Sequence, residues 1–242
     1  MFTSVTIKYV IFRHQMLQPM GVSCNVLETE SLDRIKSCPV KIMMEYAICL
    51  IYAVCFIIFW TGKAQLDCSK LPLISRDDWG SQYPTGGTPS QKPADKIFFS
   101  HTVTKTCSDR PSCEEEMRNI QDYHVNTLGF DDVGYNFVIG GDGNIYEGRG
   151  WDRIGAHTKG RNTGSLGIAF VGEYSKKDPT AEMLKAARDL IVCGVLSDKL
   201  SRDYGLYGHR DGTCTTSPGN HFYQTLRTFA QWHAHGELKK TC

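Results

Sequence analysis

The stretch NFVIGGDGNIYE at residues 136–147 indicates how this chain folds. Two short runs that contain strand-forming residues, 136–139 and 144–147, flank the turn-forming residues Gly-Gly-Asp-Gly at 140–143. This pattern predicts a β-hairpin. Downstream, residues 166–171 (LGIAFV) are apolar throughout, which is typical of a strand that is buried on both faces of a sheet.

Amphipathic segments lie on both sides of these strands. Apolar residues recur at helical spacing between Ser112, which forms a capping-box pattern with Glu115, and Gly129, which is placed to end a helix. A second helix is predicted over residues 179–196 and a third over residues 222–232.

The segment before the first helix has two parts. Residues 67–96 are rich in Pro, Gly, Ser and Thr and predict a loop-like entry segment, whereas residues 96–102 (KIFFSHT) predict a strand. The alternation of strands and helices predicts an α/β fold in which a central mixed β-sheet is flanked by helices.

Composition and charge exclude two broad classes of protein. The chain has 242 residues, with 27 Lys and Arg against 26 Asp and Glu, so its net charge is only +1. A nucleic-acid binder that works through a basic patch would carry a clear positive excess, so we expect no nucleic-acid partner. A content of 41% hydrophobic and 22% charged residues also argues against a disordered chain.

An uncharged run at residues 46–60 indicates a targeting segment. It follows Lys41 and precedes Gly62-Lys63-Ala64, so it fits a secretory signal that is cleaved after Ala64. About forty residues precede it, which leaves three interpretations. Either Met43 or Met44 is the true start, or the run is a signal-anchor of a type II membrane protein, or it is a buried core helix.

The first two interpretations place the C-terminal part outside the cell. We therefore divide the chain into an N-terminal extension of unassigned role (1–42), a signal peptide or signal-anchor (43–64) and an extracellular domain (65–242). Secretion is the favoured localisation, with a type II single-pass membrane protein as the alternative. Six of the ten cysteines fall in the domain, as expected for an oxidising compartment.

Polar side chains gather in several places along the domain. They are Ser100-His101-Thr102, His124, Tyr135, His157-Thr158 and His209-Arg210-Asp211, the last of these shortly before Ser217-Pro218-Gly219. Histidines at strand ends and in loops of an extracellular protein indicate either a zinc site or a polar ligand cleft.

Seven stretches, in this order, resemble those of the peptidoglycan recognition proteins. They are SHTVTKTCSDRPSC (100–113), NIQDYH (119–124), GFDDVGYNFVIGGDGNIYEGRGW (129–151), IGAHTKGRN (154–162), LGIAFVGEY (166–174), GHRD (208–211) and SPG (217–219). That family is related to the zinc-dependent type 2 N-acetylmuramoyl-L-alanine amidases. The resemblance runs from about Leu73 to Trp232 and implies a mixed sheet with flanking helices and a groove for bacterial peptidoglycan.

The resemblance also implies where a zinc ion would be held. Family amidases use two His and one Cys as ligands, with a Tyr near the reacting oxygen; the matching positions here are Ser100, His209, Ser217 and Tyr135. A neutral serine hydroxyl is a poor zinc ligand, whereas Cys binds as a thiolate. We therefore expect no zinc, no other cofactor and no catalytic residue, with Tyr135 and Ser217 as remnants of the site.

Two hydrolase alternatives remain open. Cys214 could replace Ser217 as a zinc ligand and preserve an amidase, or Ser217 and His209 could form a nucleophile and base that act on the stem peptide. The favoured interpretation is an innate-immune protein that binds peptidoglycan without zinc amidase activity.

Ligand-binding residues follow from the resemblance. The groove positions fall on six residues: His101, Thr102, His124, Tyr135, His157 and Asn162. Discrimination between diaminopimelate and lysine in the peptide stem is expected at Gly129, Phe130 and Arg149. Arg149 can pair with the extra carboxylate of diaminopimelate, which favours that type, although Phe130 departs from the family's diaminopimelate pattern. The alternative for Arg149 is a solvated cation on the hairpin.

Disulfides and partners complete the prediction. Cys107 and Cys113 match the family's short bridge beside the groove, and we expect Cys68 to join Cys193. A third bridge between Cys214 and Cys242 is plausible, although six cysteines allow fifteen pairings. A recognition protein without catalysis must pass on its signal, so we expect an immune-signalling partner or a second copy of the family besides peptidoglycan itself.

Overall fold

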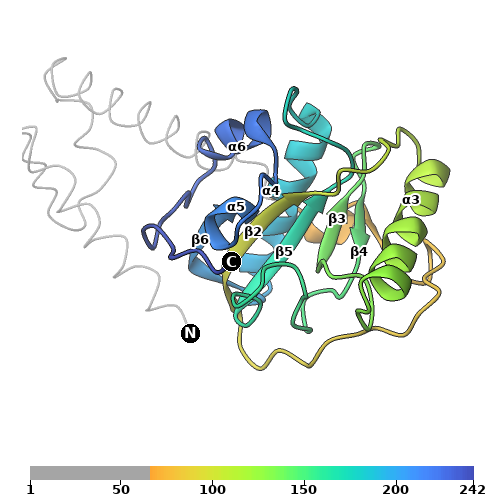
Figure 1. Ribbon diagram of the computed structural model, residues 1–242, viewed down its shortest axis with the longest axis horizontal. Helices are drawn as coiled ribbons and strands as arrows, with labels where there is room; N and C mark the ends of the chain where they lie inside the picture. Colours follow the sequence, from red (N-terminus) through yellow and green to blue (C-terminus); the bar gives the residue numbers. More distant parts are fainter. Residues whose placement is uncertain (1–65) are drawn as a thin grey trace, which may run out of the picture. The chain divides into compact units, whose positions relative to one another are not determined.

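A six-stranded sheet forms the centre of the computed structural model, which describes residues 66–242 (Figure 1). The strands are β1 (Leu73–Ile74), β2 (Ala94–His101), β3 (Phe137–Ile139), β4 (Ile145–Glu147), β5 (Ser165–Phe170) and β6 (Leu200–Gly208). Their order is β1-β4-β3-β5-β2-β6, and only the β3–β4 hairpin is antiparallel in this sheet. The predicted mixed sheet, hairpin and buried strand at β5 are confirmed.

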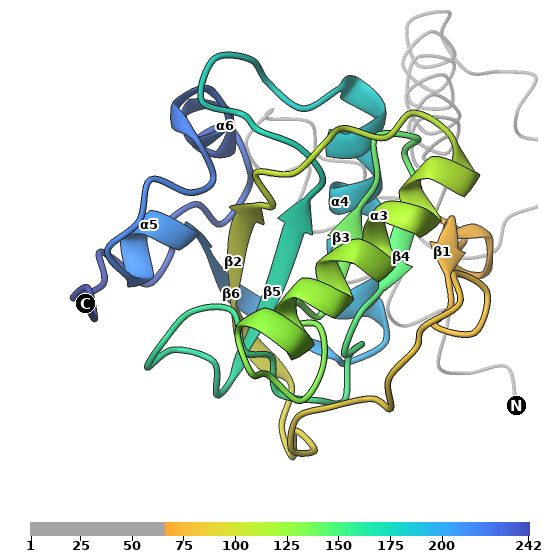
Figure 2. The same cartoon turned by 45° about the vertical axis from the view of Figure 1, so that its right-hand side comes forward.

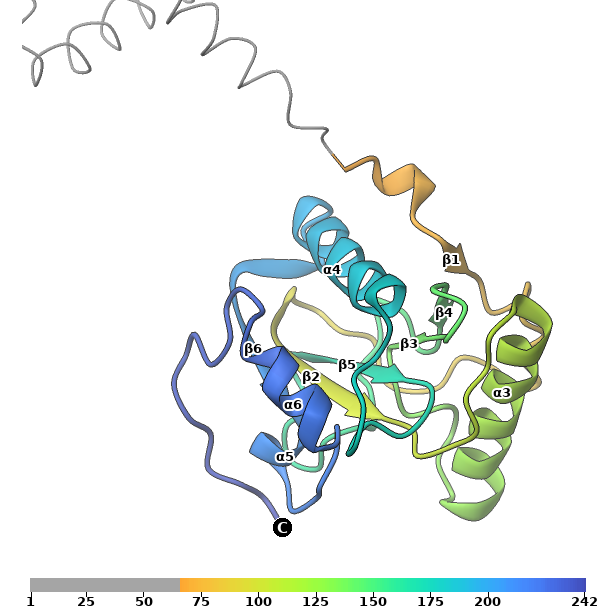
Figure 3. The same cartoon turned by 90° about the horizontal axis from the view of Figure 1, so that it is seen from above.

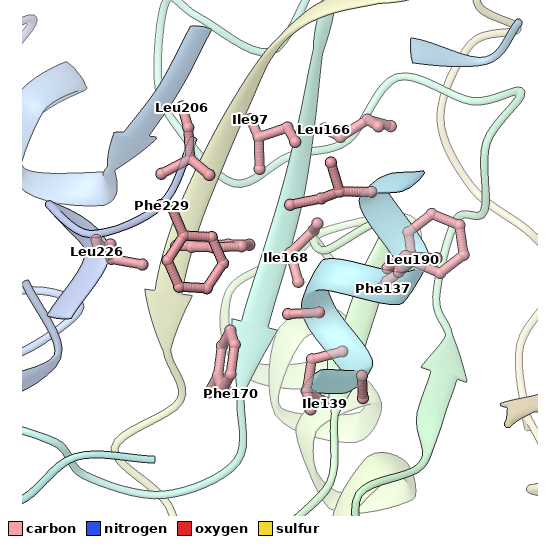
Figure 4. Close-up of a cluster of buried hydrophobic side chains, with 14 of the residues drawn as sticks. Ile97, Phe137, Ile139, Leu166, Ile168, Phe170, Leu190, Leu206, Leu226 and Phe229 are labelled. Carbon is pink, nitrogen blue, oxygen red and sulfur yellow. The ribbon is translucent and has the colours of Figure 1, made fainter. Parts of the chain in front are cut away.

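Helices cover both faces of the sheet (Figures 2 and 3). They are η3 (Cys68–Lys70), α3 (Arg110–Asp122) with its continuation η4 (Tyr123–Thr127), α4 (Ala181–Leu196), α5 (His209–Gly212) and α6 (Asn220–Leu226). Side chains of α4 and α6 pack in one hydrophobic cluster with alternate residues of the strands, and side chains of α3 pack in a second cluster. Figure 4 shows the first cluster, in which Phe137, Ile168 and Leu190 meet.

Three local predictions were wrong in detail. Helix α3 starts at Arg110 rather than Ser112, because Asp109 is the N-cap and Ser112 is its capping-box partner. The third helix, α6, ends at Leu226 rather than at residue 232. The entry segment contains strand β1, which is too short to produce a recognisable pattern in the sequence.

Disulfides join three pairs of cysteines: Cys68–Cys193, Cys107–Cys113 and Cys214–Cys242. The first ties the entry segment to α4, the second joins the segment between β2 and α3 to α3 itself, and the third holds the C-terminal tail. All three agree with the expected pairing.

The predicted extension (1–42) and the signal peptide or signal-anchor (43–64) lie outside the described residues. Between residues 66 and 242, none of the helices combines the length and the apolar character that are needed to cross a membrane.

A fully buried carboxylate, Asp132, joins three segments that are distant in sequence. It forms an ion pair with Arg76 of the entry segment at 2.9 Å and accepts hydrogen bonds from Gln121 of α3 at 2.7 Å and from the backbone N–H of Gly86 at 2.9 Å. A buried charge is tolerated only when it is paired and hydrogen-bonded, and Asp132 meets both conditions.

We predict that Asp132→Asn lowers the free energy of unfolding by about 3–5 kcal/mol, because it leaves the Arg76 guanidinium without its anionic partner. Urea unfolding followed by circular dichroism measures the change. The matched control is Asp152→Asn, whose carboxylate pairs with Lys199 at 2.6 Å on the exposed surface and should contribute little. Equal losses in the two variants would contradict the assigned role of Asp132.

Candidate functional site

The first part of the site lies where β2 and β6 end side by side. The strands are parallel and Phe99 of β2 pairs with Gly208 of β6, so the next residues along, Ser100 and His209, are neighbours. Ser217 closes this corner: its hydroxyl accepts a hydrogen bond from the backbone N–H of His101 at 3.1 Å. The three positions that the resemblance assigns to zinc ligands are therefore brought together.

Ser100, His209 and Ser217 do not provide a fitting donor set for zinc. Structural and catalytic zinc sites use thiolates, imidazoles and carboxylates, and this corner offers one imidazole and two neutral hydroxyls. Ser100 is completely buried, and its Oγ has no hydrogen-bond partner among the described residues. Within residues 66–242, no group of three or more His, Cys, Asp or Glu side chains is arranged to hold a metal ion.

His101 is fixed beside this corner. Its Nδ1 accepts a hydrogen bond from the backbone N–H of Tyr174 at 3.2 Å. Burial lowers the pKa of His101, and burial together with the nearby His101 lowers the pKa of His209 to about 4. Both imidazoles are therefore neutral at physiological pH.

An aromatic cluster forms the second part of the site. The His124 ring lies 5.5 Å from the Phe130 ring and 5.3 Å from the Tyr135 ring, measured between centroids. His124 Nδ1 accepts a hydrogen bond from the backbone N–H of Gly134 at 2.8 Å, which fixes the ring. Burial lowers the pKa of His124 to about 4 and raises the pKa of Tyr135 to about 12, so both side chains are uncharged.

His157 forms the third part and lies directly on the sheet. A Cβ atom at Gly167 of β5 would approach the His157 ring to 2.3 Å, so only glycine leaves room for the imidazole. His157 Nδ1 is 3.0 Å from the Thr158 hydroxyl, whereas Nε2 is buried without a partner among the described residues. Asn162 Oδ1 accepts hydrogen bonds from the backbone N–H groups of His157 and Thr158, so Asn162 shapes this loop.

Charged neighbours add to the effect of burial on two of these histidines. The charge of Arg149 contributes to the lowered pKa of both His124 and His157, and His209 also lowers the pKa of His157, after the larger effect of burial. The pKa of His157 falls to about 3. Arg149 is therefore close enough to His124 and His157 to interact with both electrostatically.

Arg149 differs from the solvated hairpin cation that was the alternative for it, because it is buried. Its Nε donates to the carbonyl of Val133 at 2.7 Å, and its NH1 donates to the carbonyl of Ile154 at 3.2 Å. Its NH2 pairs with Asp131 at 2.5 Å. Asp131 was not predicted as a site residue, although it lies between Phe130 and Asp132 in the stretch 129–151 that carries part of the family resemblance.

Two predicted positions lie nearer the surface. Gly129 has φ +71°, a conformation that favours glycine, and a Cβ there would meet no atom within 4 Å, so the space beside it is open. Thr102 is half-buried; its hydroxyl accepts a hydrogen bond from the backbone N–H of Gly172 at 3.0 Å and is 2.7 Å from the hydroxyl of Thr104. Its hydroxyl therefore has partners within the protein.

The sequence of this chain matches a family model and several known proteins. Residues 90–220 match the family model described as Amidase_2, N-acetylmuramoyl-L-alanine amidase. Peptidoglycan-recognition protein 1 of Holotrichia diomphalia is 43% identical over 157 residues, which cover 65% of this chain and 80% of that protein. Peptidoglycan recognition protein 1 of Bos indicus is 40% identical over 172 residues, which cover 71% and 87%.

Solved structures give the same relationship. Drosophila PGRP-LB matches with a TM-score of 0.65 and 37% identity, covering 66% of this chain and 95% of that one. Peptidoglycan recognition protein-LE, solved in complex with tracheal cytotoxin, a monomeric diaminopimelic acid-type peptidoglycan, matches with a TM-score of 0.65 and 39% identity, covering 66% and 95%. The motifs, the fold and these matches agree: the chain belongs to the peptidoglycan recognition proteins of the type 2 N-acetylmuramoyl-L-alanine amidase family.

Proposed function

We propose that this protein binds bacterial peptidoglycan in innate immunity without cleaving it. The observation that carries the proposal is the combination of two features. The predicted groove residues His124, Tyr135 and His157 are neutral side chains that can form hydrogen bonds, whereas the positions assigned to zinc ligands hold Ser100 and Ser217. Muropeptide carries sugar hydroxyls, amides and carboxylates, for which such a site is suited.

The local geometry supports binding over a serine-type hydrolysis. The Ser217 hydroxyl accepts from the His101 backbone, and no hydrogen bond among the described residues joins it to His209. The Asp211 carboxylate, which could orient His209 as a base, instead accepts hydrogen bonds from the Gly208 N–H at 2.8 Å and the Tyr223 hydroxyl at 2.6 Å. A nucleophile, a base and an orienting acid are therefore not aligned.

A preference for diaminopimelate in the stem is part of the proposal. The guanidinium of Arg149 suits the extra carboxylate of diaminopimelate, and the open space at Gly129 leaves room for it. The related protein solved with diaminopimelic acid-type peptidoglycan makes the same ligand class reasonable here.

We also propose an extracellular location and a protein partner. Three disulfides suit an oxidising compartment, in agreement with the predicted signal or anchor segment. The ectodomains of PGRP-LCa and PGRP-LCx, of which one matches this chain at 38% identity, were solved as a complex with tracheal cytotoxin. A second protein of this family is accordingly a reasonable partner for signalling.

We predict that the purified protein contains no bound zinc and leaves muropeptide intact. The variant Ser100→His/Ser217→Cys supplies the two missing ligands beside His209 and should bind about one zinc per chain. Metal analysis after dialysis against zinc measures the bound zinc in the unmodified protein and in the variant. Release of stem peptide from muropeptide measures hydrolysis. Ser100→Ala/Ser217→Ala is the matched control. Tightly bound zinc with amide cleavage by the unmodified protein would contradict the proposal.

Arg149→Lys should reduce affinity for a diaminopimelate-containing muramyl tripeptide by about tenfold, because lysine keeps the charge but lacks the two backbone-bound nitrogens that orient NH2. Affinity for the lysine-containing tripeptide should change little. Isothermal titration calorimetry gives both values. Arg153→Lys is the control, since Arg153 donates to the Gly87 carbonyl in the same region. Tighter binding of the lysine tripeptide by the unmodified protein would contradict the preference.

The neutral state of His157 leads to a prediction about pH. Its pKa is about 3 when folded and near 6.5 when unfolded, so the unfolded chain takes up the proton first as the pH falls. Stability from this group is present above pH 6.5 and decreases below it, by about 2 kcal/mol between pH 7 and pH 5. Urea unfolding at pH 7 and pH 5 measures this decrease in the free energy of unfolding, and His157→Asn should make it smaller. If the variant shows the same pH dependence as the unmodified protein, the assignment to His157 is wrong.

A further inference from the structure

Arg149 and Asp131 form an ion pair whose two members are exposed very differently. The Arg149 side chain is 3% exposed, whereas the Asp131 side chain is 60% exposed, and Arg149 NH2 lies 2.5 Å from Asp131 Oδ1. The charge that reaches solvent at this point is therefore the carboxylate. A ligand that approaches Arg149 meets Asp131 first.

The guanidinium is held in one orientation by the other contacts. Its Nε and NH1 donate to the backbone carbonyls of Val133 and Ile154. A Cβ at Gly87 would come within 2.6 Å of NH1, so the backbone of the entry segment also confines the group. Because these contacts are with backbone, a ligand can reach Arg149 most readily at the NH2 position that Asp131 occupies.

Asp131 can leave that position without losing all of its contacts. Its second oxygen, Oδ2, accepts a hydrogen bond from the backbone N–H of Gly87 at 2.6 Å. The exchange of Arg149 between Asp131 and another carboxylate therefore breaks one ion pair and forms another. Because the Asp131 side chain is 60% exposed, water can solvate its carboxylate when another anion takes its place, and Arg149 keeps an anionic partner after the exchange.

We propose that Asp131 is a specificity-determining residue that competes with the stem carboxylate of peptidoglycan for Arg149. The inference rests on the proposed peptidoglycan binding and extends it. Diaminopimelate brings a carboxylate that must displace Asp131, so Asp131 lowers the affinity for this type. Lysine brings an ammonium group that the exposed Asp131 attracts. Arg149 alone would favour diaminopimelate-type over lysine-type peptidoglycan. Asp131 makes this difference in affinity smaller.

Isothermal titration calorimetry of the whole protein with three soluble muramyl tripeptides tests the competition. The tripeptides differ only in the third residue: diaminopimelate, diaminopimelate with its side-chain carboxylate amidated, and lysine. Asp131→Asn should raise affinity for the diaminopimelate tripeptide about three- to tenfold. It should leave the amidated form within about twofold and leave the lysine form unchanged or weaker.

Two further variants separate competition from a structural role. Asp131→Glu keeps the charge and should retain the ligand preference of the unmodified protein. Asp189→Asn removes a carboxylate from a comparable 2.5 Å ion pair with Lys185 on α4, and should not change the preference. Thermal unfolding followed by circular dichroism verifies that each variant is folded.

The inference is overturned if Asp131→Asn lowers the affinity for the diaminopimelate tripeptide, or if it changes the affinity for all three tripeptides equally. Neither result would contradict the proposed binding of peptidoglycan. If the unmodified protein binds neither the tripeptides nor insoluble peptidoglycan, the proposed function fails, and the inference fails with it.

Discussion

The positions of several predicted binding residues depend on the buried carboxylate of Asp132. It connects Arg76 and Gly86 of the entry segment to Gln121 of α3, and it lies in the loop that leads into β3. The same loop carries the rings of Phe130 and Tyr135 and the carbonyl that holds Arg149. These polar contacts hold the backbone of the loop beside the second hydrophobic cluster, which includes Val133 and against which Tyr135 packs.

A buried amide performs the equivalent function at the centre of the sheet. Asn136 accepts a hydrogen bond from the backbone N–H of Gly167 at 2.9 Å and donates to the carbonyls of Gly150 and Arg153, both at 2.8 Å. It thereby joins the start of β3 to β5 and to the loop that precedes His157. The His157 ring rests on Gly167, so the position of this imidazole depends on Asn136 as well as on the missing side chain of the glycine.

Local sequence patterns predicted features that depend on neighbouring residues, whereas long-range features such as the Cys68–Cys193 disulfide were predicted only through the family resemblance. The hairpin, β5 and α4 follow from local turn residues, apolar runs and helical spacing. The N-cap of α3 was assigned three residues too late because Asp109 and Ser112 both have capping side chains. The burial of Arg149 requires Val133, Ile154 and Asp131 to converge from separate segments, which no local pattern reveals.

Among the described residues, the buried charged side chains are Asp132 and Arg149, and their partners distinguish their roles. The partner of Asp132 is Arg76, a side chain only 12% exposed, so neither charge can be replaced without leaving the other buried and unpaired. The partner of Arg149 is an exposed carboxylate, which water can solvate as soon as another anion replaces it. When both partners are buried, as in Arg76–Asp132, the pair is favoured as a fixed structural contact. When only one partner is buried, as in Arg149–Asp131, the pair is favoured as one that can exchange. Serines stand at the two positions that the resemblance assigns to zinc ligands, and neutral imidazoles lie nearby. In the proposed mode of binding, the Arg149–Asp131 pair therefore supplies the charge that the ligand meets.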